Sequence, residues 1–156
     1  MATAAGSLHR NFQGYTTDDA PVLLGFGASS IGNLADGYVQ NIVATGEYVR
    51  RINLEGLAVT RGVSLTRDDR VRGYTIERLM CEFAVSFDEL EARLGSAADA
   101  VIGELRDYAT NDSDELLVLT ATGVVVTSRG RPFVRSIAAA FDAYLADGKA
   151  RHSIAV

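Results

Sequence analysis

A short apolar run near the N-terminus constrains the fold of this chain more than any other feature. Val22-Leu23-Leu24-Gly25-Phe26-Gly27 has no polar alternation, which is typical of a strand buried on both faces, as in a parallel sheet. No second run of this type lies nearby, and a lone parallel strand cannot satisfy its backbone groups. We therefore expect residues 8–42 to be a piece of a larger sheet, poorly ordered or self-associating through residues 22–26 when isolated.

From about residue 45 the pattern becomes regular and mostly helical. Apolar periodicity predicts a series of helices and strands. The helices are expected to end at three glycines, Gly56, Gly95 and Gly148. Their expected N-caps are Thr66, Ser86, Ser96 and either Thr127 or Ser128. The predicted helices are 45–53, 66–83, 86–95, 96–108 and 128–148, with a weak strand at 57–65 and a β-hairpin at 116–126. Thr45 is expected to cap the first of these helices, and Phe133 is expected on the apolar face of the last one. Gly123 lies in the hairpin turn, where a positive φ is expected. Helices followed by a hairpin and a last helix are typical of a winged-helix-like module.

Composition excludes several classes of protein. The 156 residues carry a net charge of −5, which argues against general binding to nucleic acid or to an anionic membrane surface. The single cysteine, Cys81, rules out a disulfide framework and any multi-thiolate metal site built by this chain alone. No apolar stretch approaches the ~18 residues of a membrane span, and the first seven residues do not have the pattern of a signal peptide. We expect a cytoplasmic protein with no membrane partner.

Few residues suggest chemistry by themselves. His9 and His152 stand near opposite ends of the chain, so no metal site is predicted. Cys81 has no adjacent Lys or His to activate its thiol and is interpreted as a small buried hydrophobic residue. Residues 25–30, Gly-Phe-Gly-Ala-Ser-Ser, resemble half of a phosphate-binding loop. Two interpretations stay open: these glycines let backbone approach a ligand, or they let the loop pack closely on its own chain.

Arginines are dense in two places, around residues 61–78 and 129–135. Such groups on a winged helix could contact nucleic-acid phosphates. Asp68, Asp69 and Glu77 are interleaved with the first group at helical spacing, which favours pairing within a helix. We therefore favour a salt-bridged face and do not expect nucleic acid as a partner.

Several longer strings carry a family resemblance. The strings are Leu-His-Arg-Asn-Phe-Gln-Gly-Tyr-Thr-Thr at 8–17, Leu-Leu-Gly-Phe-Gly-Ala-Ser-Ser-Ile at 23–31, Tyr-Val-Gln-Asn at 38–41, Arg-Gly-Val-Ser-Leu-Thr-Arg-Asp-Asp at 61–69, Val-Thr-Ser-Arg-Gly-Arg at 126–131 and Phe-Asp-Ala-Tyr-Leu at 141–145. In these strings the chain resembles the oxygen-independent coproporphyrinogen III oxidases, which are radical S-adenosylmethionine enzymes of haem biosynthesis. The resemblance covers nearly the whole length after Ser7.

This resemblance implies a fold and an activity. Family members have an incomplete (β/α) barrel, which holds a [4Fe–4S] cluster and S-adenosylmethionine, and a mostly helical C-terminal domain. They convert two propionates of coproporphyrinogen III into vinyl groups, giving protoporphyrinogen IX. The expected fold class is α+β: residues 1–42 are a C-terminal remnant of the barrel, and residues 43–156 are a helical, winged-helix-like C-terminal domain with a β-hairpin.

The resemblance also implies site residues. Phe12, Gln13 and Ile31 match positions that line the S-adenosylmethionine pocket, while Gly25 and Gly27 are expected to let the backbone approach this cofactor. His9 and Arg10, beside Phe12, are candidates for contacting the anionic coproporphyrinogen III, without support from the family. No catalytic residue is assigned.

One departure from the family limits what this chain can do. The three-cysteine loop that binds the cluster is missing, so we expect no turnover without the barrel, which is the expected partner. Two alternative functions are kept: an independent nucleic-acid-binding module, and a haem-binding relative in which His9, His152, Cys81 or a methionine is the axial ligand.

Overall fold

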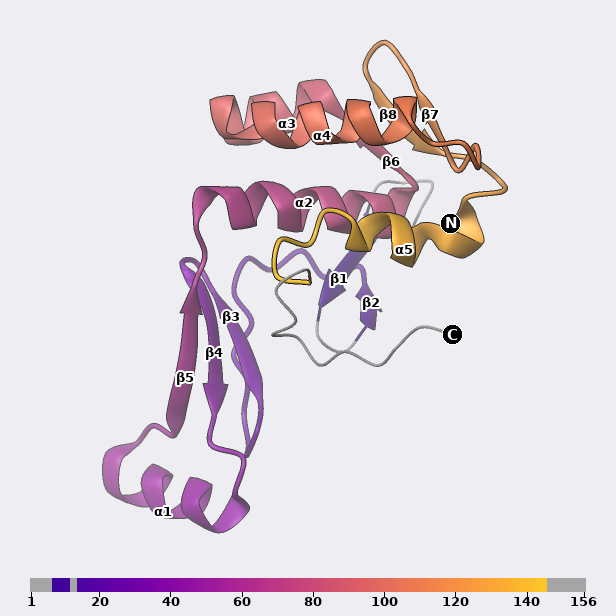
Figure 1. Cartoon of the computed structure of the whole chain (residues 1–156). Helices are drawn as coiled ribbons and strands as arrows, with labels where there is room; N and C mark the ends of the chain where they lie inside the picture. The colour runs from indigo at the N-terminus through magenta and orange to yellow at the C-terminus, as the bar shows by residue number, and fades with distance from the viewer. Residues whose placement is uncertain (1–6, 12–13, 146–156) are drawn as a thin grey trace. The chain divides into compact units, whose positions relative to one another are not determined.

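The structure, a computed structural model, describes residues 7–11 and 14–145 of the 156-residue chain. The chain divides into two compact units. Of the described residues, the sheet unit comprises 11, 14 and 18–66, and the helical unit comprises 7–10, 15–17 and 67–145. The domain boundary expected at residue 42 stays a prediction. Figure 1 shows both units.

The sheet unit is built on three antiparallel strands, β3 (Ile31–Leu34), β4 (Gly37–Asn41) and β5 (Val59–Ser64). β4 lies between the other two and pairs with both of them. The weak strand expected at 57–65 is thus confirmed as β5, and all six of its residues are exposed. The register of β4 against β5 shifts between Gln40 and Asn41, which marks a β-bulge.

Helix α1 (Thr45–Glu55) connects β4 to β5 and crosses the far end of their sheet, as Figure 1 shows. Gly56 ends it in the left-handed conformation with φ 75°, as the sequence predicts. Its N-cap is Ala44, one residue before the predicted cap, and no side chain caps it.

The apolar run at residues 22–27 is the first expectation that the structure changes. It does not form a strand buried on both faces: Leu23 makes an isolated bridge to Asn33, with N···O distances of 2.8 Å in both directions. The side chains of Leu24 and Phe26 are 63% and 87% exposed. In this chain the run is an extended segment beside the edge of β3.

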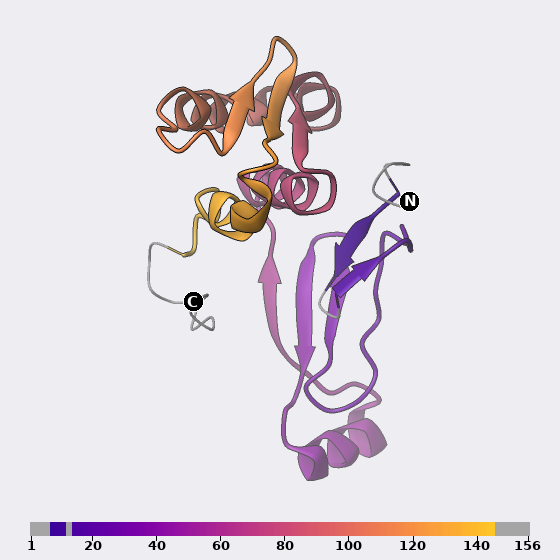
Figure 2. The same ribbon diagram turned by 90° about the vertical axis from the view of Figure 1, so that its right-hand side faces the viewer.

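The helical unit places α2 (Arg67–Glu82) and α5 (Val134–Ala139) against each other beneath a layer of α3 (Phe87–Leu94) and α4 (Asp99–Thr110) (Figures 1 and 2). Ser86 caps α3, its hydroxyl accepting from the Glu89 amide at 3.3 Å, which confirms the predicted cap. A 3-10 turn (Gly95–Ala98) precedes α4, so the cap expected at Ser96 is wrong.

The predicted hairpin consists of β7 (Leu117–Leu119) and β8 (Gly123–Val126). A third strand, β6 (Ala84–Ser86), pairs with β8, so that β8 lies in the middle of the sheet. Gly123 does not have the positive φ expected in the hairpin turn. Glycine is required for another reason: a Cβ there would lie 2.1 Å from the Val85 carbonyl oxygen.

Two short pieces complete the described chain. β1 (His9–Asn11) and β2 (Gly14–Thr16) form a two-stranded sheet. Before α5, the chain makes a 3-10 turn (Arg131–Phe133) that contains Pro132. The last helix is therefore shorter than expected within the described residues, and its predicted end at Gly148 lies outside them.

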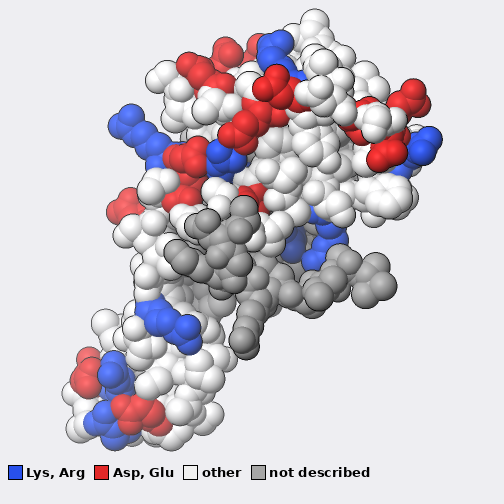
Figure 3. Space-filling model, viewed as in Figure 1, with Lys and Arg blue, Asp and Glu red and all other residues white. Residues whose placement is uncertain are grey.

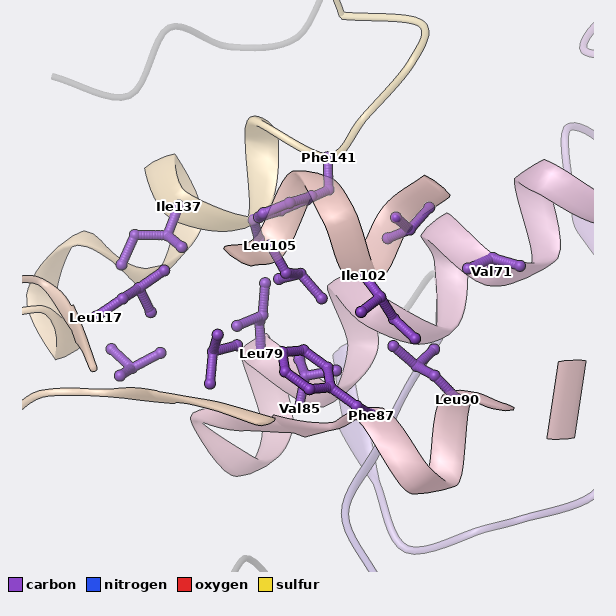
Figure 4. Packing of buried hydrophobic residues seen from close by; sticks show 14 of the residues in the cluster. Val71, Leu79, Val85, Phe87, Leu90, Ile102, Leu105, Leu117, Ile137 and Phe141 are labelled. Atoms are coloured by element: carbon purple, nitrogen blue, oxygen red, sulfur yellow. The ribbon is translucent and has the colours of Figure 1, made fainter. Parts of the chain in front are cut away.

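The hydrophobic core lies inside the helical unit (Figure 4). Side chains from α2, α3, α4, α5 and the three-stranded sheet meet there, the largest of those fully buried being Phe141, Leu79, Leu90, Leu105 and Ile137. Burial of these residues supplies the main stabilisation of this unit. Phe133, expected on the apolar face of the last helix, is instead 51% exposed.

Arginines of the first dense group form ion pairs within the helical unit. Arg72 contacts Asp68 one turn earlier on α2 at 2.7 Å, and Arg78 contacts Glu82 one turn later. The predicted intrahelical pairing is thus confirmed for Arg72 with Asp68, whereas Arg78 pairs with Glu82, an acid outside the predicted set. Basic and acidic atoms lie interspersed over the face of this unit seen in Figure 3.

Candidate functional site

The glycine turn, defined here as residues 25–30, is the part of the sheet unit where the predicted cofactor residues meet. It enters β3, whose first residue is Ile31. The Ile31 side chain is half-buried, and Ile31 pairs with Gln40 of β4. Gly25, Gly27 and Ile31, three of the five predicted cofactor residues, are therefore brought together by one turn and the start of one strand.

The two glycines of this turn are required for different reasons. A Cβ on Gly25 would lie 2.7 Å from the Ile31 carbonyl oxygen, so this glycine is needed because the chain packs closely on itself. Gly27 has φ +103°, which other residues rarely adopt, and a Cβ there would meet only Ser30 Oγ, at 3.7 Å. Of the two interpretations left open by the sequence, close packing accounts for Gly25. Gly27 faces open space.

Hydrogen bonds from β4 and α1 hold the turn. The Asn41 side-chain amide donates to the carbonyl oxygens of Gly25 and Gly27 at 3.1 and 3.0 Å. The Gly27 amide donates to the Tyr48 hydroxyl at 3.1 Å. The turn is thus fixed by side chains far along the sequence.

Asn41 and Tyr48 were not predicted as site residues from the sequence. The string Tyr-Val-Gln-Asn at 38–41 carried the family resemblance, but no role followed for its asparagine. An amide at the end of an alternating strand, after a glycine-rich turn, is the signal that could have indicated it, because such turns leave carbonyls that need donors.

Phe12 and Gln13, the other two predicted cofactor residues, lie outside the described residues. The structure does describe their neighbours His9 and Arg10, which belong to the helical unit. His9 Nδ1 lies 3.1 Å from Glu77 Oε1 on α2, and the Arg10 amide donates to the same oxygen at 3.4 Å. Arg78 donates to the Leu8 carbonyl oxygen at 3.4 Å. These contacts attach residues 8–10 to α2.

Cys81 is completely buried on α2, as expected of a small hydrophobic residue. Burial raises the pKa of its thiol, and the nearby Glu77 carboxylate raises it further. A high thiol pKa disfavours the thiolate, which is the form that binds metal or acts as a nucleophile. Within residues 7–11 and 14–145, no group of three or more His, Cys, Asp or Glu side chains could hold a metal ion.

Two hollows in the described surface lie away from the glycine turn. One, of about 330 Å³, lies between β3, β4 and β5 around Asp36, Tyr38 and Val63. The other, of about 170 Å³, is lined by Asp114, Leu116, Arg129 and Phe133 in the helical unit. Neither of these two hollows has Gly27 or Ile31 among its lining residues. None of the described helices is long and apolar enough to span a bilayer.

The residues present fit the family's two cofactors differently. An open Gly27 face and a half-buried Ile31 side chain suit contact with one side of a nucleoside, so they fit S-adenosylmethionine as a partial wall. A [4Fe–4S] cluster is held by several Cys thiolates, whereas the sequence contains one cysteine, Cys81, which is buried.

Comparisons with known proteins agree along nearly the whole chain. Residues 65–133 match the HemN C-terminal domain family. A relative from Bradyrhizobium diazoefficiens, named oxygen-independent coproporphyrinogen III oxidase, is 47% identical over 150 residues, which are 96% of this chain and 33% of that protein. A relative of the same name from Salmonella typhimurium is 40% identical over 146 residues, covering 93% of this chain and 32% of that protein.

A solved structure gives the same result in three dimensions. Coproporphyrinogen III oxidase (HemN) from Escherichia coli, described as a radical SAM enzyme, superposes with a TM-score of 0.83 at 38% identity, covering 92% of this chain and 33% of that one. Fold and sequence together define a HemN C-terminal domain. The chain corresponds to the C-terminal portion of the HemN-type oxygen-independent coproporphyrinogen III oxidases and spans about a third of the length of the relatives it matches.

Proposed function

We propose that this chain supplies one wall of the S-adenosylmethionine and substrate site of an oxygen-independent coproporphyrinogen III oxidase. The reaction is the oxidative decarboxylation of two propionates of coproporphyrinogen III to vinyl groups, which gives protoporphyrinogen IX. The observation that carries the proposal is the 47% identity to such an oxidase over 96% of this chain, which includes the glycine turn.

The proposed contacts with S-adenosylmethionine come from the glycine turn and from two residues before it. Ile31 provides apolar area for a nucleoside, and Gly27 leaves room for the ligand against the backbone. Gly25 acts indirectly by allowing the turn to close on Ile31. Gln13 offers an amide for polar atoms and Phe12 an aromatic ring, as the resemblance implies. When bound, S-adenosylmethionine supplies the radical that removes hydrogen from the substrate.

His9 and Arg10 complete the proposal as residues that face the anionic substrate. Their described contacts weaken this part of it, because His9 is already paired with the Glu77 carboxylate. A propionate would have to compete with Glu77 for the imidazole.

We propose that the chain has no turnover alone. Its only cysteine is buried, so the cluster has to be held by a barrel polypeptide, which is the proposed protein partner together with coproporphyrinogen III as substrate. A cytoplasmic location belongs to the same proposal.

The helical unit is proposed to be winged-helix-like. This is supported by the order helix, strand, two helices and hairpin from α2 to β8, with β8 between β6 and β7. In the same proposal, residues 1–42 are the remnant of the last barrel segment and residues 43–156 form the C-terminal domain.

A chimeric enzyme tests the proposed function. This chain replaces the matching third of the Bradyrhizobium diazoefficiens relative, and the purified protein is assayed anaerobically with coproporphyrinogen III. The proposal expects cleavage of S-adenosylmethionine and formation of protoporphyrinogen IX by the chimera, and neither by the chain alone. A folded chimera with an intact cluster but no cleavage would refute it.

Binding experiments on the chain separate the proposal from its alternatives. A Soret band that rises on titration of the chain with haem would favour a haem-binding relative. A gel shift with duplex DNA at low salt, where phosphate contacts are strongest, would favour a nucleic-acid module.

A further inference from the structure

The side-chain amide of Asn41 joins two carbonyl groups of the glycine turn that flank Phe26. Its nitrogen donates to Gly25 O at 3.1 Å and to Gly27 O at 3.0 Å. A primary amide carries two N–H bonds, so one nitrogen can serve both acceptors. A carboxylate at this position could serve neither and would repel both.

The β-bulge explains why Asn41 can reach the turn. Gln40 pairs with Arg61, but Asn41 pairs with Val59, so Thr60 is an extra residue on β5. A bulge bends the local strand and changes the direction of side chains, and bulges are common beside functional sites. Beyond it, backbone bonds close the turn onto the end of β4: Asn41 N to Ser30 O at 3.0 Å, and Ser29 N to Ile42 O at 2.9 Å.

Tyr48 of α1 accepts a hydrogen bond from the glycine turn, whereas Asn41 donates hydrogen bonds to it. The Tyr48 hydroxyl accepts from the Gly27 amide at 3.1 Å, so donor and acceptor groups of one glycine are both engaged by side chains. The turn is therefore held between a strand and a helix.

The glycine turn has to be held by hydrogen bonds, because the burial of apolar side chains contributes little to it. Gly25 and Gly27 carry the largest backbone freedom of any residue type, which opposes a single conformation. Phe26 between them is 87% exposed and contributes no appreciable burial in the described chain. The conformation in which Gly27 keeps φ +103° is held by the Asn41 and Tyr48 contacts, together with the Ser30 hydroxyl and amide, which also donate to the Gly27 carbonyl oxygen.

We infer that Asn41, supported by Tyr48, is a positioning residue for S-adenosylmethionine: it fixes the turn in the conformation that presents Gly27 and Ile31 to the nucleoside. This inference rests on the proposed function and adds to it two residues outside the predicted pocket set. Neither residue is assigned a contact with the cofactor or a part in the chemistry.

The variant Asn41→Asp tests the inference, because it keeps the shape and replaces the donor nitrogen by an acceptor. Asn53→Asp is the matched control: it makes the same chemical change on α1, where the side chain is exposed. The chain contains no tryptophan, so Phe26→Trp introduces the one tryptophan of this part of the protein, at the tip of the turn, and serves as the reporter in every protein compared.

Two measurements are made on these proteins. In the chain alone, amide hydrogen exchange at Gly27 is expected to accelerate about tenfold in N41D and to stay unchanged in N53D. In the chimera, fluorescence titration is expected to show about tenfold weaker binding of S-adenosylmethionine in N41D, with KM for this cofactor raised and kcat retained at saturation. A purely structural defect would lower the active fraction and so reduce kcat.

The outcomes distinguish the inference from the proposed function. If the parent chimera does not bind S-adenosylmethionine, the proposed function fails and the inference fails with it. If the parent binds and N41D binds equally well, only the inference is overturned. If N41D unfolds the sheet unit, Tyr48→Phe replaces it: loss of the acceptor for Gly27 N should weaken binding in the same direction, and unchanged binding would overturn the inference.

Discussion

Arg72 of α2 clamps Glu104 of α4 with two parallel hydrogen bonds of 2.9 and 2.8 Å. The same guanidinium also donates to Asp68 on its own helix and to the Phe141 carbonyl oxygen. These bonds raise the pKa of Arg72 further above its ordinary value. One side chain thereby connects two helices and the C-terminal segment of the helical unit.

Arg72→Met should lower the free energy of unfolding by about 1–2 kcal/mol, because the bidentate pair and the carbonyl contact are lost while the Glu104 carboxylate stays accessible to water. Urea unfolding measures this change. A double-mutant cycle with Glu104→Gln should give a coupling of about 0.5–1 kcal/mol, and a coupling of zero would contradict the clamp. The matched control, Arg50→Met, breaks the exposed pair with Glu47 on α1 and should have a smaller effect.

Gly123→Ala should unfold the three-stranded sheet or cost more than about 3 kcal/mol, since the new Cβ would overlap the Val85 carbonyl oxygen on β6. Gly73→Ala is the control: it lies in α2, and a Cβ there meets no atom within 4 Å. That change should stabilise the protein by about 0.5–1 kcal/mol through helix propensity. Thermal unfolding of both variants gives the comparison, and equal melting temperatures would be the contrary result.

Phe141→Ala should cost about 3–5 kcal/mol, because the ring is almost completely buried and packs against Tyr108 with 5.8 Å between the ring centroids. Phe133→Ala removes the same side chain from a position that is 51% exposed and should cost less than about 1 kcal/mol. Chemical denaturation of the two variants tests this difference. Similar losses would mean that the exposed and buried positions had been assigned wrongly.

The stability of the protein at alkaline pH depends on two weakly acidic side chains, Cys81 in the core and Tyr108 beside it. Burial raises the pKa of the Cys81 thiol and of the Tyr108 phenol above their ordinary values. A raised folded-state pKa means that the folded protein binds these protons more tightly, so their contribution to stability is complete below the unfolded-state pKa values and is lost as the pH rises through the folded ones.

The free energy of unfolding should therefore fall above about pH 9, where the thiol of the unfolded chain begins to ionise. Urea titrations at a series of pH values measure it. In Cys81→Ala the decline should be smaller, with Tyr108 still contributing. A variant that declines as steeply as the parent would exclude Cys81 as a cause.

Local signals in the sequence predicted the elements whose stabilising contacts are local. Gly56 ends α1, Ser86 caps α3, and the hairpin of β7 and β8 forms where alternating residues surround a turn. β6 was missed because three residues are too short for a detectable period, and its strand conformation depends on pairing with β8. Phe133 was assigned to the core because helical spacing was continued through Pro132, where the chain forms a 3-10 turn instead.

The candidate site was predictable only in part. Glycine spacing and the family strings indicated Gly25, Gly27 and Ile31 from residues that are adjacent in sequence. Asn41 and Tyr48 lie 14 and 21 positions from Gly27, and their contacts with it depend on how β4 and α1 return to the turn. No pattern among neighbouring residues in the sequence indicates that β4 and α1 come back to the glycine turn.

Because the β-bulge lets Asn41 reach the glycine turn, the number of residues in β5 affects the candidate site. Deleting Thr60 would leave one residue on β5 opposite each residue of β4, and the strand would straighten at Asn41. The asparagine would still be present, yet its amide would point elsewhere. Redesign of this sheet therefore has to preserve the spacing between Val59 and Arg61 as strictly as it preserves the asparagine, although neither of these residues touches the turn by any described contact.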